Sequence, residues 1–282
     1  MSEAAPLIAF IGTTPNIGTT VAAFAAAYRI AEQSKLPVAY LCLHLKSSKL
    51  HRYLGLDEPE QTLDKLQPEL RAFSLTSRKL QQSMYKVQKL PQLSVLFGNL
   101  NRDQAEFYLP QHIEHLLSVA RQTFSVIIVD AGAYWDNAAT ICAMRQASTK
   151  IIATTSALSH FQEDGKRWLI DIAPLYQVAP HEYECLTITY PWKNGGFQMK
   201  QVYKEMNLSP IGQFQLTESM YYQLDRGQYE QWLQKDKLGK LAMNGSANKI
   251  MQRYRLDKQP GVIRNQPWYR RLIMHRNGAR SS

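Results

Sequence analysis

The sequence predicts an α/β fold, a doubly wound and mostly parallel sheet, followed by a basic, helical C-terminal extension. Between Pro6 and Tyr28, an apolar run, a turn bounded by glycines and an Ala-rich helical stretch follow one another. Further short apolar runs alternate with helical patterns as far as residue 228, which is typical of parallel strands connected by helices. The composition then becomes strongly basic. We therefore expect two parts, residues 1–228 and residues 229–282.

The first strand, turn and helix have the geometry of a phosphate-binding loop. In such a loop, backbone N–H groups point inward and the following helix dipole favours an anion. The usual spacing G-x-x-x-x-G-K-[ST] is not kept, because Gly12 and Gly18 are one residue farther apart and Thr19 follows in place of lysine. An αβ connection without a ligand is the alternative. The candidate nucleotide-binding residues are Gly12, Thr13, Thr14, Asn16, Ile17, Gly18, Thr19 and Thr20.

The later elements follow in order. Runs of β-rich, apolar residues predict strands at 37–43, 93–99, 125–130, 150–155, 185–189 and near 208–215. Apolar residues at helical spacing predict helices at 75–90, 111–122 and 159–172, and helical pieces broken around 244–246. Asp130 ends its strand beside the glycine loop, where it could hold Mg²⁺ through water. Capping of the next helix is the alternative role of this carboxylate.

The glycine loop resembles the deviant phosphate loop of the ParA/MinD ATPases, whose pattern is K-G-G-x-G-K-T-T. Thr19, Thr20 and Val21 match its end, whereas the two family lysines fall on Thr13 and Gly18. The resemblance extends over about residues 6 to 228 and implies a P-loop NTPase fold. In that fold, Thr19 would hold a magnesium ion together with Asp130.

The segment after the second strand departs from this family. Members carry V-D-x-D-x-[QRK] there, and Cys42, His44 and Lys46 occupy the three polar positions. In the family, these aspartates help to position the attacking water and the metal. The resemblance therefore implies ATP and Mg²⁺ as the expected cofactors, and a loop that binds no nucleotide is the alternative. Because these groups are missing, we expect no catalytic residue and negligible ATP hydrolysis.

A member with these losses is similar to the pilus-assembly branch of the family, the TadZ/CpaE-like proteins. In that branch, a protein with an ATPase fold marks a site at the membrane and recruits a secretion machine. The resemblance implies a scaffolding or localisation protein, a homodimer, and membrane-associated secretion or pilus machinery as the partner. LKSSKLHRYLGLD also resembles the bacterial tyrosine kinases, a further alternative that the missing loop lysine disfavours.

All of the net charge lies in the last part of the chain. Residues 231–282 contain twelve Lys and Arg and two Asp, which equals the net charge of +10 of the 282-residue chain. Such a tail favours an acidic partner, and anionic lipid and non-specific DNA binding are the two alternatives. The candidate partner or membrane residues are Trp268, Arg270, Arg271, Leu272, Ile273 and Arg276.

Several function classes are excluded by composition. No apolar run reaches the length of about 18 residues that a membrane span needs, and the N-terminal residues lack a basic signal region. The three cysteines have no metal-ligand spacing. We therefore expect a cytoplasmic protein, peripheral at the inner face of the membrane if its tail binds lipid. Liposome flotation beside a DNA shift at two salt concentrations would separate the lipid and DNA alternatives.

Overall fold

The computed structural model of the chain describes residues 4–46, 48–191 and 197–256. These residues form one eight-stranded sheet in the order β3-β4-β2-β5-β1-β6-β7-β8. All neighbouring strands are parallel except the antiparallel pair β3 and β4. The strands are β1 (Leu7–Gly12), β2 (Val38–Cys42), β3 (Tyr85–Lys86), β4 (Leu93–Leu96), β5 (Val126–Asp130), β6 (Thr149–Thr155), β7 (Tyr183–Thr189) and β8 (Ser209–Gln215).

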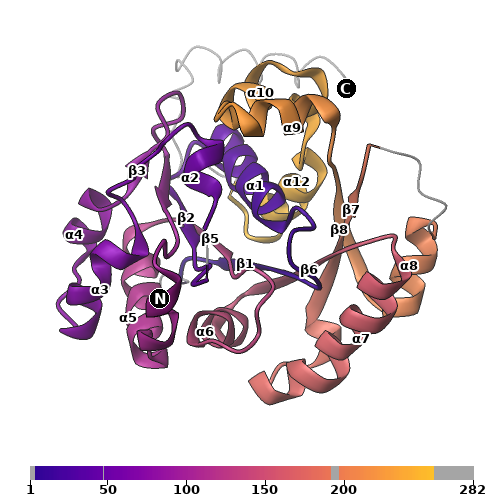
Figure 1. The fold of residues 1–282 in the computed structure, drawn as a ribbon, viewed down its shortest axis with the longest axis horizontal. Helices are drawn as coiled ribbons and strands as arrows, with labels where there is room; N and C mark the ends of the chain where they lie inside the picture. Colours follow the sequence, from indigo (N-terminus) through magenta and orange to yellow (C-terminus); the bar gives the residue numbers. More distant parts are fainter. Residues whose placement is uncertain (1–3, 47, 192–196, 257–282) are drawn as a thin grey trace, which may run out of the picture.

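Helices cover both faces of the sheet, as predicted for a doubly wound fold. The α-helices are α1 (Thr19–Ser34), α2 (Leu50–Tyr53), α3 (Leu63–Arg71), α4 (Ser77–Gln82), α5 (Pro110–Thr123), α6 (Ala138–Gln146), α7 (Gly165–Arg167), α8 (Met199–Met206), α9 (Glu218–Asp225), α10 (Tyr229–Lys235), α11 (Lys237–Leu241) and α12 (Asn244–Arg253). The helical segments η2 (Ser159–Asp164) and η3 (Trp168–Ile172) have π-type turns and continue α7 on either side. Shorter 3-10 turns are η1 (Arg102–Phe107), η4 (Ala173–Tyr176) and η5 (Pro180–Glu182). Figure 1 shows α1, α10 and α12 on one side of the sheet, and α5, α6 and α7 on the other.

The hydrophobic core consists of two clusters, one on each face of the sheet, and strand β1 contributes to both. All six of its residues are buried, because a parallel strand in the middle of a sheet has helices on both faces. Side chains alternate between those faces along a strand. Leu7, Ala9 and Ile11 accordingly belong to one hydrophobic cluster, and Ile8 and Phe10 belong to the other.

The topology brings one set of loops together at the carboxyl edge of the sheet. From β1 the chain continues to β2, β3 and β4 on one side of the sheet and returns to β5, which lies between β2 and β1. It then crosses β1 to form β6, β7 and β8 on the other side. The loops after β1, β2 and β5 therefore meet beside β1, where the strand order reverses. Open parallel sheets place their ligands in the crevice at such a point.

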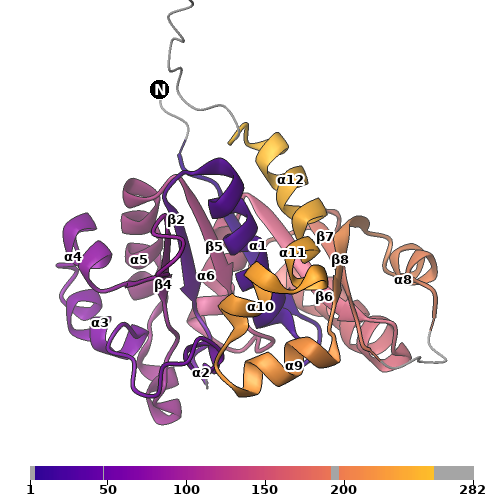
Figure 2. The same ribbon diagram turned by 90° about the horizontal axis from the view of Figure 1, so that it is seen from above.

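The helices that follow residue 228 pack on α1 rather than standing apart from the sheet. Tyr229 and Trp232 of α10, and Ile250 of α12, lie in the same buried cluster as the apolar face of α1. Both views show α12 running beside α1 (Figures 1 and 2). The predicted helical C-terminal region is present, and its described part shares a core with the first helix.

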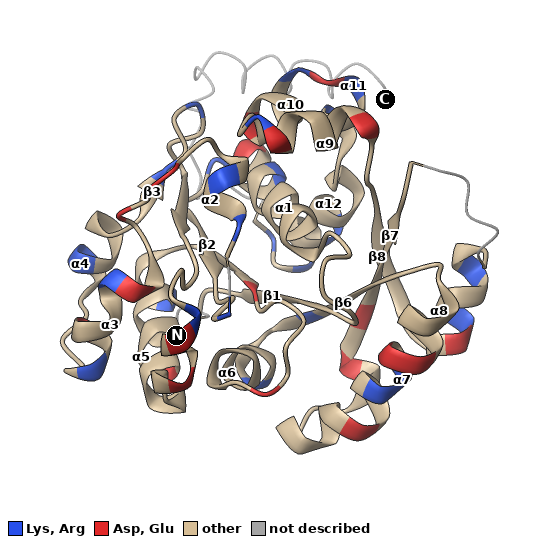
Figure 3. Ribbon diagram, in the orientation of Figure 1, with Lys and Arg blue, Asp and Glu red and all other residues tan. Residues whose placement is uncertain are grey.

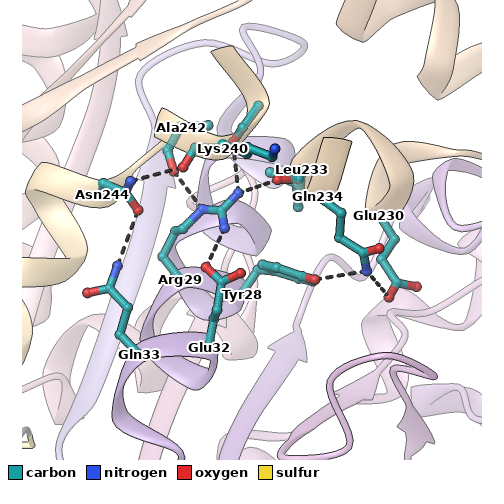
Figure 4. Close-up of polar contacts among 11 residues, drawn as sticks. Tyr28, Arg29, Glu32, Gln33, Glu230, Leu233, Gln234, Lys240, Ala242 and Asn244 are labelled. Carbon is teal, nitrogen blue, oxygen red and sulfur yellow. Dashed lines mark hydrogen bonds and ion pairs between the residues drawn. The ribbon is translucent and has the colours of Figure 1, made fainter. Parts of the chain in front are cut away.

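A buried arginine on α1 holds these helices by polar contacts. Arg29 is 2% exposed, and its Nη2 donates to the backbone carbonyls of Leu233 at 2.6 Å and Gly239 at 2.8 Å. Its Nε donates to the carbonyl of Ala242 at 3.3 Å, and Nη1 forms an ion pair with Glu32 (Figure 4). One guanidinium therefore satisfies carbonyls from α10, α11 and the turn before α12.

Two local predictions were wrong. The expected helix at 75–90 is limited to α4, because Tyr85 and Lys86 instead pair with Val95 and Ser94 as the edge strand β3. The expected break at 244–246 lies earlier, since Met243 adopts a left-handed conformation with φ of 58° and α12 begins directly after it.

Among the residues that the structure describes, no helix is long and apolar enough to cross a membrane.

Candidate functional site

The loop between β1 and α1 requires glycine at two positions, Gly12 and Gly18, for steric reasons. Gly18 precedes α1 with φ of 101°, a left-handed conformation that residues with a side chain rarely adopt. A Cβ atom on Gly12 would lie 2.6 Å from Oγ1 of Thr19. Glycine at these two positions therefore lets the loop fold back tightly before the helix starts.

The first part of the loop is fixed to the sheet by hydrogen bonds. The backbone N–H of Gly12 donates to the carbonyl of Gly132 at 2.8 Å, and the N–H of Thr13 donates to that of Ala153 at 2.9 Å. The Thr14 hydroxyl donates to the carboxylate of Asp164. The loop is thus attached to the segments after β5 and β6 as well as to its own strand.

A cavity of about 250 Å³ lies where these loops meet. Four chain segments line it, and all of them follow the carboxyl ends of strands. They contribute Thr14, Pro15, Asn16, Gly18, Thr19, Thr20 and Val21 after β1; Cys42, His44, Ser48, Lys49 and Tyr53 from the end of β2 to α2; Gly132, Ala133 and Tyr134 after β5; and Leu216, Met220, Tyr221 and Leu224 after β8. The loop side is polar, whereas the β8 side is apolar and aromatic.

The charge around the cavity favours an anion. Among the residues that the structure describes, its lining contains no carboxylate and Lys49 is its one lysine. The N-terminus of α1, whose first N–H groups have no intrahelical acceptor, adds partial positive charge. Basic residues occur on α2 and on the segment before it (Figure 3). Burial lowers the pKa of His44, and Lys46 and Lys49 lower it further, although Asp130 has the opposite effect.

Asp130 lies behind the cavity and is fully buried. Its Oδ1 accepts from the backbone N–H of Gly132 at 3.1 Å, and its Oδ2 accepts from the hydroxyl of Tyr40 at 3.1 Å. It does not cap the next helix, because the side chain of Asn137 has that role. Of the two alternatives, the capping role is therefore excluded.

Cys42 takes the place of the first aspartate expected after the second strand. Its Sγ lies 3.4 Å from Oγ of Ser48 and 4.0 Å from Oδ2 of Asp130. Burial, with a further contribution from Asp130, raises the pKa of this thiol to about 12. A neutral thiol therefore lies beside the buried carboxylate of Asp130, and it cannot position a water as a carboxylate would.

The structure divides the predicted nucleotide-binding residues into two groups. Thr14, Asn16, Gly18, Thr19 and Thr20 line the cavity. Gly12, Thr13 and Ile17 lie behind it, the first two held by the sheet and Ile17 in the core. The predicted partner or membrane residues between Trp268 and Arg276 lie outside the described residues.

Sequence reasoning missed the cavity residues that follow β2 and β8. Lys49 and Tyr53 follow the second strand at positions where the family motif has ended, and Leu216 to Leu224 follow the last strand. Only the strand order could have identified them, because each lies just beyond the carboxyl end of a parallel strand, where ligands bind in such sheets. Glycine spacing and charge patterns alone could not find them.

No family model and no curated protein matches this sequence. Solved structures do match its fold. The ParA family ATPase from Chlorobium tepidum aligns with a TM-score of 0.74 and 16% identity, over 87% of this chain and 99% of that one. The cell division ATPase MinD from Pyrococcus furiosus aligns with a TM-score of 0.71 and 15% identity, over 88% and 99% of the two chains.

A third match carries a bound nucleotide. The septum site-determining protein MinD from Pyrococcus horikoshii, complexed with Mg-ADP, has a TM-score of 0.71 and 13% identity, over 90% of this chain and 99% of that one. At these identities the likeness establishes the fold. The expected P-loop NTPase fold of the ParA/MinD type is therefore confirmed.

Proposed function

We propose that this protein binds a nucleoside triphosphate and acts as a scaffolding or localisation protein, rather than as an active ATPase. It would support assembly of a pilus or secretion machine at the membrane, in the manner of the TadZ/CpaE-like proteins. One observation carries the proposal: the cavity keeps the glycine loop and the helix N-terminus, while no carboxylate lines it in the described part of the chain.

The two sides of the cavity suit the two ends of a nucleotide. The loop from Thr14 to Thr20 offers backbone N–H groups and hydroxyls to phosphate. The apolar wall with Tyr221 and Met220 offers a surface on which a base could pack. The bound Mg-ADP in the Pyrococcus horikoshii MinD supports a nucleotide in a protein of this fold.

The residues present are compatible with a magnesium ion. Thr19 offers a hydroxyl at the cavity, and Asp130 would act through water, since each of its oxygens already accepts one protein hydrogen bond. Bound there with nucleotide, the ion would supply positive charge beside the phosphates. The chain itself would supply the loop that orients them.

Hydrolysis of ATP is expected to be at least about 100-fold slower than in an active MinD-type ATPase. Loss of one preorganised group that stabilises transition-state charge typically has an effect of this size, and here both loop lysines and both aspartates after β2 are absent. Phosphate release from the purified protein with saturating ATP and Mg²⁺ measures this. A rate within tenfold of the active enzyme would contradict the proposed loss of catalysis.

Replacing Asn16 by aspartate is expected to weaken ATP binding by about tenfold or more, because it adds a negative charge beside the phosphates. Asn16 is exposed at the cavity with φ of 63°, a conformation that Asp also tolerates, so the fold should not change. Calorimetric titration with ATP and Mg²⁺ measures the affinity.

Asn207→Asp is the matched control, because Asn207 is also exposed, has φ of 52° and does not line the cavity. It should bind as the wild type does. If Asn16→Asp also bound ATP with wild-type affinity, the nucleotide would not occupy this loop. Absence of binding by the wild-type protein would overturn the nucleotide part of the proposal.

A further inference from the structure

Lys49 lines the same cavity as the glycine loop but comes from a different segment, the one after β2. It lies directly before α2, its side chain is exposed, and it lines the cavity with Ser48 and His44. We propose that Lys49 supplies, from the segment after β2, the cation that contacts the phosphates of a bound nucleoside triphosphate. It would replace the lysines that are absent from the loop. This inference rests on the proposed function.

The neighbouring lysine cannot take this role without losing other contacts. Nζ of Lys46 lies 2.9 Å from Oδ2 of Asp136 and 4.7 Å from the ring centre of Tyr134. Among the described residues, Lys49 forms no ion pair. Its ammonium group is therefore available to a phosphate, whereas that of Lys46 is already neutralised by a carboxylate.

The positive charge of Lys49 also reaches the cavity. Burial lowers the pKa of His44, which lines the cavity, and that of His51 in α2, and the charge of Lys49 makes a smaller contribution in the same direction. Within residues 4–46, 48–191 and 197–256, no carboxylate lines the cavity to compensate this charge. A phosphate entering the cavity would therefore meet an uncompensated cation on a long, flexible side chain with three donors.

Titration of Lys49→Gln with ATP and with adenosine tests this role. We expect the affinity for ATP to fall by about tenfold or more, because a charge-assisted hydrogen bond is lost, and the affinity for adenosine to stay unchanged. Lys49→Arg, which keeps the charge, should bind ATP within about threefold of the wild type. Lys65→Gln, on the exposed side of α3, is the matched control and should bind as the wild type does.

The outcomes separate this inference from the function on which it rests. If the wild type binds ATP and Lys49→Gln binds it equally well, Lys49 is not the phosphate cation and the proposed function stands. An equal loss of ATP and adenosine binding would show that Lys49 only shapes the cavity, which also overturns the inference. If the wild type binds no ATP, the proposed function fails and this inference fails with it.

Discussion

Replacing Arg29 by methionine is expected to destabilise the protein by about 3 kcal/mol, although methionine keeps much of the apolar volume. Removing the donor from a buried hydrogen-bond network leaves acceptors unsatisfied, and each acceptor left so typically costs about 1 to 3 kcal/mol. Here the carbonyls of Leu233, Gly239 and Ala242 would lose their shared donor. The loss should first loosen the packing of α10 to α12 on α1.

Denaturant unfolding at equilibrium measures this change in the free energy of unfolding. Arg52→Met is the control, since Arg52 pairs with Asp57 while their side chains are 58% and 88% exposed. Exposed pairs contribute little, so this variant should differ from the wild type by less than about 1 kcal/mol. Equal effects of the two variants would contradict a structural role for the Arg29 network.

The change in charge after residue 228 does not predict that the following helices pack on the core. The sequence becomes basic after residue 228, and this favours an appendage. The core nevertheless continues, because Tyr229 donates from its hydroxyl to the carbonyl of Val21 at 2.7 Å and packs near Phe24. Net charge reflects the solvent-facing residues of a helix, whereas its packing depends on the few apolar ones.

Other parts of the fold were predictable because their signals are local. The run that became β1 is apolar throughout and the run that became β5 is apolar up to Asp130, and strands covered on both faces have this pattern. The edge strand β3 was not predictable, since two residues become a strand only by pairing with β4.

In the candidate site, too, some residues could be predicted from local sequence and others could not. The loop from Gly12 to Thr20 is contiguous in sequence, and a motif can describe it. Lys49 and Tyr221 reach the same cavity from segments far apart in the chain, so the topology had to be known before either could be assigned.

Replacing Gly227 by alanine is expected to destabilise the protein by about 3 kcal/mol. Gly227 has φ of 68°, which disfavours a side chain by about 1 kcal/mol. Its new Cβ would lie 2.5 Å from Cα of Gly55 and 3.0 Å from the carbonyl oxygen of Arg52. These are backbone atoms that cannot rotate away, and overpacking of this kind costs a further 1 to 3 kcal/mol.

Gly245→Ala is the control, measured in the same unfolding experiment. Apart from its own helix backbone and chain neighbours, no atom of the described residues lies within 4 Å of the added Cβ, and the residue is in the first turn of α12. This variant should be as stable as the wild type or more stable by up to about 1 kcal/mol, because alanine favours a helix. A Gly227→Ala protein as stable as Gly245→Ala would show that the backbones need not approach so closely.

The close approach of Gly55 and Gly227 has a consequence for the site. Gly55 directly follows the turn at the end of α2, and Gly227 follows α9. The same two helices supply Tyr53 and Tyr221 to the cavity. A side chain at residue 227 would push the helices apart and move these rings, so Gly227→Ala should also weaken ATP binding in the fraction of protein that remains folded. The two glycines thus connect the stability of the fold to the shape of its cavity.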